Sequence, residues 1–157
     1  MAKPPLFDIS AIDFSKVQHG VDVIESINPH RGAMRLLDGI IHETDDHLQV
    51  IAFKDVGHDE FWVPGHIPGR PIFPGVLMIE AAAQLASYQT LRVFPDIEFM
   101  GFAGLDEVKF RGQVGPGDRF IVVNQAIEIK RRRSISRSQG YVNDKLCFEA
   151  VVVGIPF

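Results

Sequence analysis

The stretch VLMIEAAAQLASYQTLRV, residues 76–93, decides the fold. Its alanines, leucines and length predict one long helix. The first three turns are apolar on every face apart from Glu80 and Gln84, and a helix that is apolar all round is a buried one. Pro74 fits the first helical position, and Pro95 follows the end of the run. The rest of the chain is therefore expected to enclose this helix.

The remaining segments predict the layer around the helix. Residues 1–20 carry prolines and no clear period, as in a loosely attached arm, and residues 21–27 predict a short helical turn that ends at Asn28 and Pro29. Two β-branched, apolar runs at 34–44 and 47–56 flank a polar turn, and a loop rich in proline and glycine covers 57–75. Residues 97–154 indicate further strands joined by tight turns.

These elements predict an α+β fold. We count five or six strands and one long helix, in the order β-β-α-β-β-β. Consecutive strands joined by tight turns favour an antiparallel sheet, and the apolar helix requires that sheet to curve around it. The expected organisation is an arm at 1–20 and a single domain at 21–157.

Composition excludes several classes of protein. The chain has 157 residues, 46% of them apolar and 23% charged, which is typical of a globular domain. The formal net charge of −4 gives no general attraction to nucleic acid or to anionic lipid. A single cysteine, Cys147, allows no internal disulfide, and the N-terminus lacks the apolar core of a signal peptide. We expect a soluble protein of the cytoplasm, with no membrane or nucleic-acid partner.

The segment PGHIPGRPIFPGVLMIEAAAQ, residues 64–84, holds the candidate site. A histidine in a loop is more often structural than catalytic, and a helical glutamate is more often solvated, but Glu80 has apolar neighbours one turn away on either side. We expect burial to keep a proton on Glu80, so that an acid and the imidazole base of His66 share one site. The amides of Gly75 and Val76 open the helix and favour negative charge on an oxygen. An acid, a base and a polarised carbonyl suit β-elimination: dehydration of a 3-hydroxyacyl compound, or its reverse.

The same residues closely resemble the motif of the β-hydroxyacyl-(acyl carrier protein) dehydratases of the FabZ type, which have the hot-dog fold. The match includes the histidine, the PG-x-P-x-x-PG-V-L frame, a glutamate fourteen positions on and the E-A-x-A-Q ending. Weaker similarities cover NPHRGAMRLLD and FAGLDEVKFRGQVGPGDRF. The related isomerising dehydratases usually carry aspartate at the position of Glu80, so glutamate favours the plain dehydratase.

The resemblance implies roles for individual residues. His66 would remove the Cα proton of a (3R)-3-hydroxyacyl thioester, and Glu80 would protonate the leaving hydroxyl to give a trans-2-enoyl thioester. The amide of Gly75 would hold the thioester carbonyl, and Gln84 would orient the acid. Family members place each site at a dimer interface, with the histidine from one subunit and the acid from the other, and many are trimers of dimers. No cofactor is implied.

The family also implies an apolar tunnel for the acyl chain beside the central helix, with Phe73 and Phe102 as wall residues. Relatives often have two aromatic residues before A-G-[IL]-D-E, whereas this chain has Gly101 and Phe102 there. One expected ring is therefore missing, which leaves the preferred chain length open.

A basic cluster lies in the segment KRRRSISR. It comprises Lys130, Arg131, Arg132, Arg133 and Arg137. Alternate polar residues are normal in a half-exposed strand, and this explanation is as good as the functional one, docking of an acidic acyl carrier protein. Nucleic-acid binding is disfavoured because no stacking aromatics interleave the cluster.

Other polar residues favour structural roles. The spacing of His58, Asp59, Glu60 and His66 matches no compact ligand set, so no metal site is expected. We expect His30 to cap or pack under the loop and Cys147 to be a packed thiol. Asp106 and Glu107 are expected to pair with Lys109 or Arg111.

Two other functions remain open from the sequence. A hydratase or thioesterase acting on acyl-coenzyme A would use a similar oxyanion site, although a thioesterase needs an activated water rather than an acid. A non-catalytic module that binds acyl chains or carrier proteins is the alternative of another class. The His66–Glu80 pair favours the dehydratase over that module.

Overall fold

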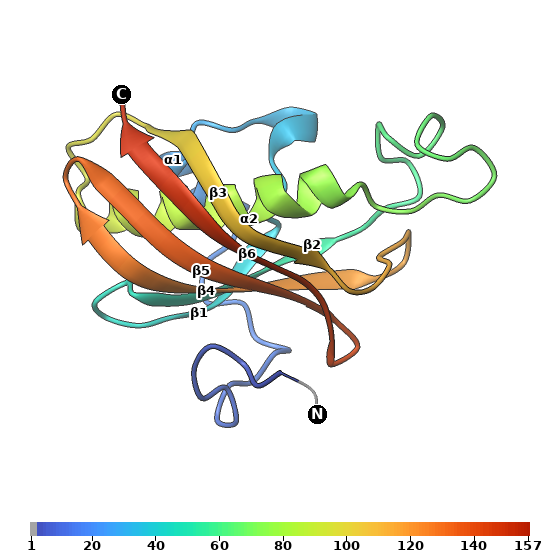
Figure 1. Cartoon of the computed structure of the whole chain (residues 1–157), viewed down its shortest axis with the longest axis horizontal. Coiled ribbons are helices and arrows are strands. Elements are labelled where there is room, and N and C mark those ends of the chain that lie inside the picture. The colour runs from blue at the N-terminus through green and yellow to red at the C-terminus, as the bar shows by residue number, and fades with distance from the viewer. Residues whose placement is uncertain (1–2) are drawn as a thin grey trace.

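The computed structural model describes residues 3–157 as one curved sheet around one long helix (Figure 1). The elements in chain order are α1 (Val21–Ile27), a 3₁₀ turn (Gly32–Met34), β1 (Gly39–Glu43), β2 (Gln49–Asp55), α2 (Gly75–Val93), β3 (Met100–Phe110), β4 (Arg119–Lys130), β5 (Arg133–Val142) and β6 (Lys145–Pro156). All strand pairs are antiparallel, in the order β1-β2-β4-β5-β6-β3. The predicted α+β layout is confirmed, with six strands.

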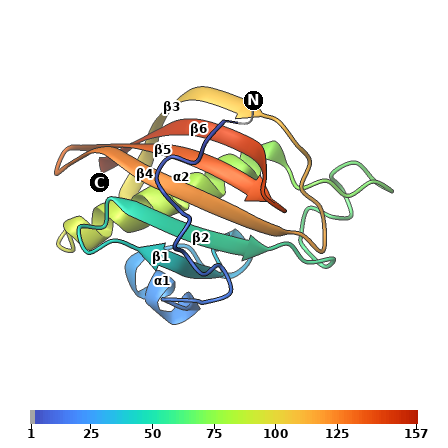
Figure 2. The same ribbon diagram turned by 90° about the horizontal axis from the view of Figure 1, so that it is seen from below.

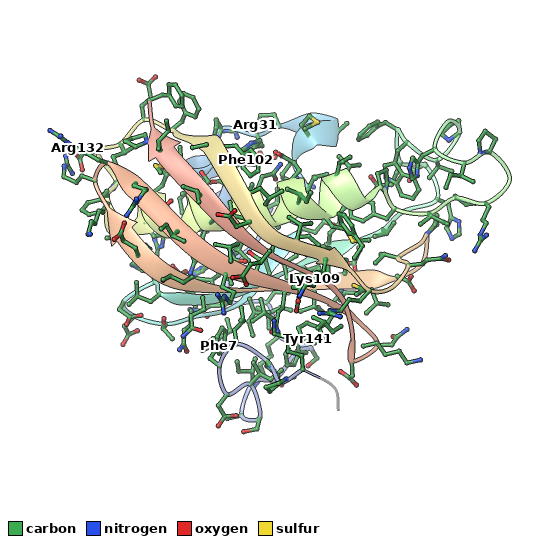
Figure 3. All side chains as sticks on the ribbon, viewed as in Figure 1. Phe7, Arg31, Phe102, Lys109, Arg132 and Tyr141 are labelled. Atoms are coloured by element: carbon green, nitrogen blue, oxygen red, sulfur yellow. The ribbon has the colours of Figure 1, made fainter. Side chains whose placement is uncertain are left out.

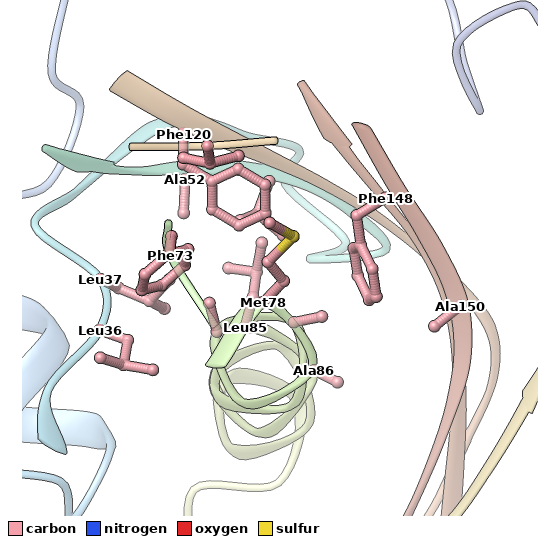
Figure 4. Close-up of a cluster of buried hydrophobic side chains, with 14 of the residues drawn as sticks. Leu36, Leu37, Ala52, Phe73, Met78, Leu85, Ala86, Phe120, Phe148 and Ala150 are labelled. Atoms are coloured by element: carbon pink, nitrogen blue, oxygen red, sulfur yellow. The ribbon is translucent and has the colours of Figure 1, made fainter. Parts of the chain in front are cut away.

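Helix α2 is enclosed because its sequence leaves it almost no polar face. Met78, Ala81, Ala82 and Leu85 are buried against the inner face of the sheet. Figure 4 shows the phenyl rings of Phe73, Phe120 and Phe148 packed around the helix. Burying each large apolar side chain contributes roughly 1.5–3 kcal/mol. The helix therefore cannot leave the sheet without exposing most of the core.

One predicted boundary differs slightly from the structure, and another agrees with it. The helix begins at Gly75, one residue after Pro74, which is the N-cap with φ −57° and ψ 130°. Proline also suits this position, because a residue that precedes the first helical turn needs no backbone N–H. Helix α1 ends at Asn28, as the Asn28-Pro29 pair predicts.

The N-terminal arm lies across the outer face of the sheet, opposite α2 (Figure 2). Side chains from the arm and the sheet form a second apolar cluster, which comprises Leu6, Phe7, Ile9, Ile12, Phe14, Ile41, Ile51, Phe53, Ile121, Val123 and Tyr141. Figure 3 shows Phe7 and Tyr141 on this outer side. The amide of Gln139 donates to the carbonyl of Pro4 at 3.1 Å. Apolar packing thus fastens the arm to the sheet.

Strand β3 forms one edge of the sheet and pairs only with β6. It is irregular: its register shifts between Asp106 and Lys109, and Glu107 has a positive φ of 53°. The rings of Phe102 and Phe110 are exposed along it. An unpaired edge with exposed apolar side chains can accept another strand.

A buried carboxylate joins the C-terminal half of α2 to β1. Glu43 accepts hydrogen bonds from Arg92 and from the hydroxyl of Tyr88, both at 2.9 Å. Burial pushes the pKa of Glu43 upward, but the bonds from Arg92 and Tyr88 and the nearby His47 bring it below its ordinary value.

No helix among residues 3–157 is both long and apolar enough to cross a membrane.

The stability of the fold should therefore depend on pH through Glu43. Because its folded-state pKa is depressed, its contribution is complete above the unfolded-state pKa of about 4.3 and is lost as pH falls through the folded-state value. Glu43→Gln should lower the free energy of unfolding at pH 7 by about 1–3 kcal/mol and by less at pH 4. Urea unfolding of both proteins at the two pH values measures this. An equal loss at both pH values would show that the ionisation of Glu43 does not contribute to stability.

Candidate active site

The loop at 57–74 holds His66 in one orientation. The backbone amide of His66 donates to the carbonyl of Trp62, and its Nδ1 lies 2.7 Å from the carbonyl oxygen of Ile72. A carbonyl only accepts hydrogen bonds, so in the neutral ring Nδ1 carries the proton and Nε2 has the free lone pair. The next residue, Ile67, has φ 58°, which is costly for a β-branched side chain. The local backbone is thus strained beside a histidine whose Nε2 can act as a base.

Aromatic packing ties this loop to the core. The ring of Trp62 lies 5.6 Å from that of Phe73, which lies 5.9 Å from Phe120 on β4. Phe73 is only 1% exposed, and its amide donates to the carbonyl of Val114. Phe73 was expected in the wall of an acyl tunnel; the structure places it in the core, where it supports the loop.

The N-terminus of α2 presents free amides. The first intrahelical bonds run from Leu77 and Met78 to the carbonyl of Pro74, so the amides of Gly75 and Val76 have no acceptor within the helix. The side chain of Val76 is 70% exposed, and the ring of Phe110 covers Gly75. A Cβ at Gly75 would lie 2.8 Å from that ring. Glycine is therefore needed for this close packing.

Glu80 lies one turn further along α2 and opens onto a cavity. Its side chain is 30% exposed, so the expectation of a wholly buried carboxyl needs correction. The amide of Gln84 donates to Oε1 of Glu80 at 2.8 Å, which agrees with the orienting role expected of Gln84. Position i+4 on a helix places the two side chains side by side.

Gln84 also fastens α2 to the segment at 28–36. Its Nε2 donates to the carbonyl of Met34 at 2.7 Å, and its Oε1 accepts from the amide of Leu36 at 2.9 Å. The side-chain amide of Asn28 donates to the backbone carbonyl of Gln84 at 2.8 Å. These three bonds link residues about fifty positions apart and position the segment beside Glu80.

His30 belongs to this segment and faces Glu80. Its Nε2 lies 3.4 Å from Oε1 of Glu80, and its side chain is 26% exposed. Burial lowers the pKa of His30; the charge of Glu80 opposes this and that of Arg31 adds to it. The prediction that His30 only caps or packs missed this contact. The sequence signal was an imidazole in the segment NPHR, but nothing in sequence spacing relates it to Glu80.

The cavity has a volume of about 230 Å³ and lies between α2, β3 and β6. Its lining residues are Pro29, His30, Glu80, Ala83, Gln84, Ala86, Ser87, Phe99, Met100, Gly101, Phe102, Ser134, Val152, Val153 and Gly154. Phe102, predicted to lie in the wall of an acyl tunnel, is among the residues that line this cavity and is 54% exposed. His66 is not among the residues that line this cavity.

Most of the basic cluster is already paired. Lys130 and Arg133 contact Glu128, Arg131 contacts Asp96, and Arg137 contacts Glu107. Among residues 3–157, Arg132 is the one member of the cluster in no ion pair, and it lies at the tip of the β4–β5 hairpin (Figure 3). The pairing reduces the charge that this hairpin can offer an acidic partner.

Three minor expectations have different outcomes. Lys109 and Arg111 pair with Glu149 rather than with Asp106 or Glu107, so that prediction was wrong. Cys147 is a packed thiol, as expected; burial raises its pKa to about 12. Over the described residues, no three His, Cys, Asp or Glu side chains cluster as metal ligands would.

An antiparallel sheet curled around one buried helix defines a hot-dog-fold protein. The solved structure of the dehydratase heterocomplex ApeI:P from Xenorhabdus doucetiae has this fold: its TM-score is 0.71 at 16% identity, over 85% of this chain and 90% of that one. A protein of Pyrococcus horikoshii described as uncharacterised matches with a TM-score of 0.59 at 16% identity, over 78% and 84% of the two chains. At these identities the likeness concerns the fold alone.

Sequence comparison is more specific. The model of the FabA-like domain matches residues 28–151. The 3-hydroxyacyl-(acyl-carrier-protein) dehydratase FabZ of Lawsonia intracellularis is 38% identical over 136 residues, which cover 84% of this chain and 88% of that protein. Its counterpart in Thermotoga petrophila is 41% identical over 101 residues, which cover 64% and 71%. This chain belongs to the FabA-like family, as a FabZ-type dehydratase.

The triple tether at Gln84 can be tested directly. Gln84→Leu leaves the amide of Leu36 and the carbonyl of Met34 without partners, which should lower the free energy of unfolding by about 1–3 kcal/mol. It should also speed hydrogen exchange at the Leu36 amide more than at the Ile51 amide on strand β2. Equal protection of Leu36 in both proteins would contradict the tether.

Proposed function

We propose that this chain is a hydro-lyase of fatty-acid synthesis, which converts (3R)-3-hydroxyacyl thioesters on acyl carrier protein to trans-2-enoyl thioesters. The observation that carries the proposal is the contact between Nδ1 of His66 and the carbonyl of Ile72. In the neutral ring this contact places the proton on Nδ1, so that the lone pair of Nε2 is the one that can accept the Cα proton. The FabZ relatives supply the substrate class.

The other two parts of the reaction fall to α2. The amides of Gly75 and Val76 would bind the thioester carbonyl oxygen and stabilise the charge that grows on it when Cα loses its proton. Glu80 would donate a proton to the 3-hydroxyl, which leaves as water. Gln84 donates a hydrogen bond to Oε1 of Glu80 and thereby fixes the orientation of the carboxyl relative to the helix. The reaction needs no other group than these side chains and amides.

We propose that each active site is shared between two copies of the chain. His66 and Glu80 do not line the same cavity within one chain. Strand β3 has a free edge with the exposed rings of Phe102 and Phe110, and Phe110 packs on Gly75 at the start of α2. Pairing two β3 edges by a two-fold axis would bury these rings and bring the second copy beside the helix. A hexamer of three such dimers remains compatible with this arrangement.

Docking of the acyl carrier protein would rely on few free charges. Among the described residues, Arg132 is the member of the hairpin cluster that is in no ion pair, whereas Arg31 contacts Glu25 and donates to nearby backbone carbonyls. We propose the cytoplasm as the compartment, because the single thiol of Cys147 is buried and needs no oxidising environment.

Glu80→Gln tests the acid. An amide cannot deliver the proton to the leaving hydroxyl, so kcat for the dehydration of 3-hydroxybutyryl carrier protein should fall by about 10²–10⁴. The bond from Gln84 can persist, so folding and substrate binding should be kept. Ultraviolet absorbance of the enoyl thioester gives the rate, and release of free thiol reports any thioesterase. A near-normal kcat in this variant, or thiol release without enoyl product, would refute the dehydratase.

Mixing two inactive variants tests the shared site. His66→Ala and Glu80→Gln subunits, exchanged after mild denaturation, should form heterodimers in which one of the two sites has both groups. Activity should return to about a quarter of the wild-type rate, because half of the dimers are mixed and each has one intact site. Subunit exchange is checked by mass spectrometry of a tagged copy. If exchanged mixtures stay inactive, a single chain supplies both groups.

A further inference from the structure

We infer that His30 is a positioning residue for Glu80: a neutral imidazole protonated on Nε2 holds Oε1 of the carboxyl, so that Oε2 is the oxygen that carries the reacting proton. The inference rests on the proposed function, in which Glu80 is the acid. His30 would then orient the acid, a role that is separate from the fold and from the pairing of His66 with Glu80.

The imidazole of His30 is held beside Glu80 by its neighbours. His30 lies within 3.4 Å of Oε1 of Glu80, in the cavity that both residues line. Its segment is fixed on both sides, since Asn28 binds the backbone of Gln84 and Leu36 binds its side chain. The guanidinium of Arg31 donates to the carbonyls of Asn28 and His30 at 2.7 and 2.8 Å. The imidazole is therefore held against Glu80 by contacts outside the ring.

The surroundings of Nδ1 determine which neutral tautomer His30 adopts. Nδ1 of His30 is buried and has no hydrogen-bond partner among the described residues. A buried N–H without an acceptor is rarer and more costly than a buried lone pair without a donor. In the neutral ring the proton should therefore reside on Nε2, the nitrogen that faces Glu80. Burial lowers the pKa of His30 and so favours the neutral ring; Glu80 opposes this and Arg31 supports it.

Two nitrogen donors approach the same carboxyl oxygen of Glu80. Gln84 donates to Oε1 at 2.8 Å, and Nε2–H of His30 approaches the same oxygen. An oxygen that accepts from two donors is disfavoured as the site of the carboxyl proton. The proton of the acid is thereby directed to Oε2. In turnover this proton passes to the 3-hydroxyl, which leaves as water, while Nε2 of His66 takes the proton from Cα.

The contact is longer than an ordinary N–H···O bond of about 2.7–3.2 Å. Hydrogen bonds in active sites are often long before substrate binds and shorten in the complex. A purely packing role would be filled equally well by an apolar ring, which would avoid the unpartnered Nδ1. The buried Nδ1 without a partner is accounted for if Nε2 of the same ring donates to Glu80.

Nitrogen-15 NMR of the protein labelled at histidine tests the tautomer. At pH 7.5 we expect the His30 resonances of a neutral ring protonated on Nε2, assigned by their loss in His30→Gln. A ring protonated on Nδ1, or an imidazolium, would overturn the inference. This measurement does not depend on turnover, so it decides the point even if a variant folds poorly.

Kinetics of paired variants test the positioning role. His30→Leu removes the donor and should lower kcat by about 10–100-fold with KM nearly unchanged, since a misdirected acid slows the chemical step. His30→Gln places an amide N–H at a similar distance from Cα, and should keep kcat within about threefold of wild type. His42→Leu, on the edge strand β1, is the matched control and should behave as wild type.

The outcomes separate this inference from the proposed function. If Glu80→Gln is inactive but His30→Leu is fully active, the acid role stands and the role of His30 is wrong. If His30→Gln is as impaired as His30→Leu while both keep the wild-type melting temperature, donation from Nε2 is not what matters. An active Glu80→Gln variant would remove the basis of both.

Discussion

The enclosure of α2 by the sheet is the constraint on which the rest depends. Because the helix is apolar on nearly every face, it can only exist inside the curved sheet, packed on rings such as Phe73 and Phe120 (Figure 4). Few groups of α2 can take part in the reaction. They are the backbone amides of its first turn and the polar side chains of Glu80 and Gln84. A buried helix thus offers a dipole end and one acid side chain, both carried by a helix that is packed on the core.

The second constraint is the fastening of neighbouring segments to that helix. Gln84 uses both ends of its side chain to hold the segment at 28–36, which brings His30 to Glu80. The loop before the helix is held by Trp62 and Phe73 and by the bond from His66 to the carbonyl of Ile72. Each polar group of the site is therefore oriented by a residue of the core, and the strained backbone at Ile67 is kept by this support.

Sequence reasoning worked where the information was local. The first three turns of residues 76–93 are apolar on nearly every face and predict the buried helix, and the alternation and turns of residues 97–154 predict the strands. The spacing from His66 to Glu80, read with its proline frame, leads to the family. It failed where contacts join distant residues: no periodicity relates His30 to Glu80, or Phe7 to Tyr141 across the outer face of the sheet. The pairing of the basic hairpin with Glu128 and Asp96 likewise depends on geometry that charge counting does not contain.

In the proposed mechanism, an imidazole base and a carboxyl acid meet on one thioester at the N-terminus of a buried helix. A crystal structure of the oligomer with a non-reacting 3-hydroxyacyl thioester analogue measures this most directly. The carbonyl oxygen should lie within hydrogen-bond distance of the amides of Gly75 and Val76, with Nε2 of His66 next to Cα and Oε2 of Glu80 next to the 3-hydroxyl. A ligand that touches only one of the two side chains, whichever subunits supply them, would contradict the mechanism.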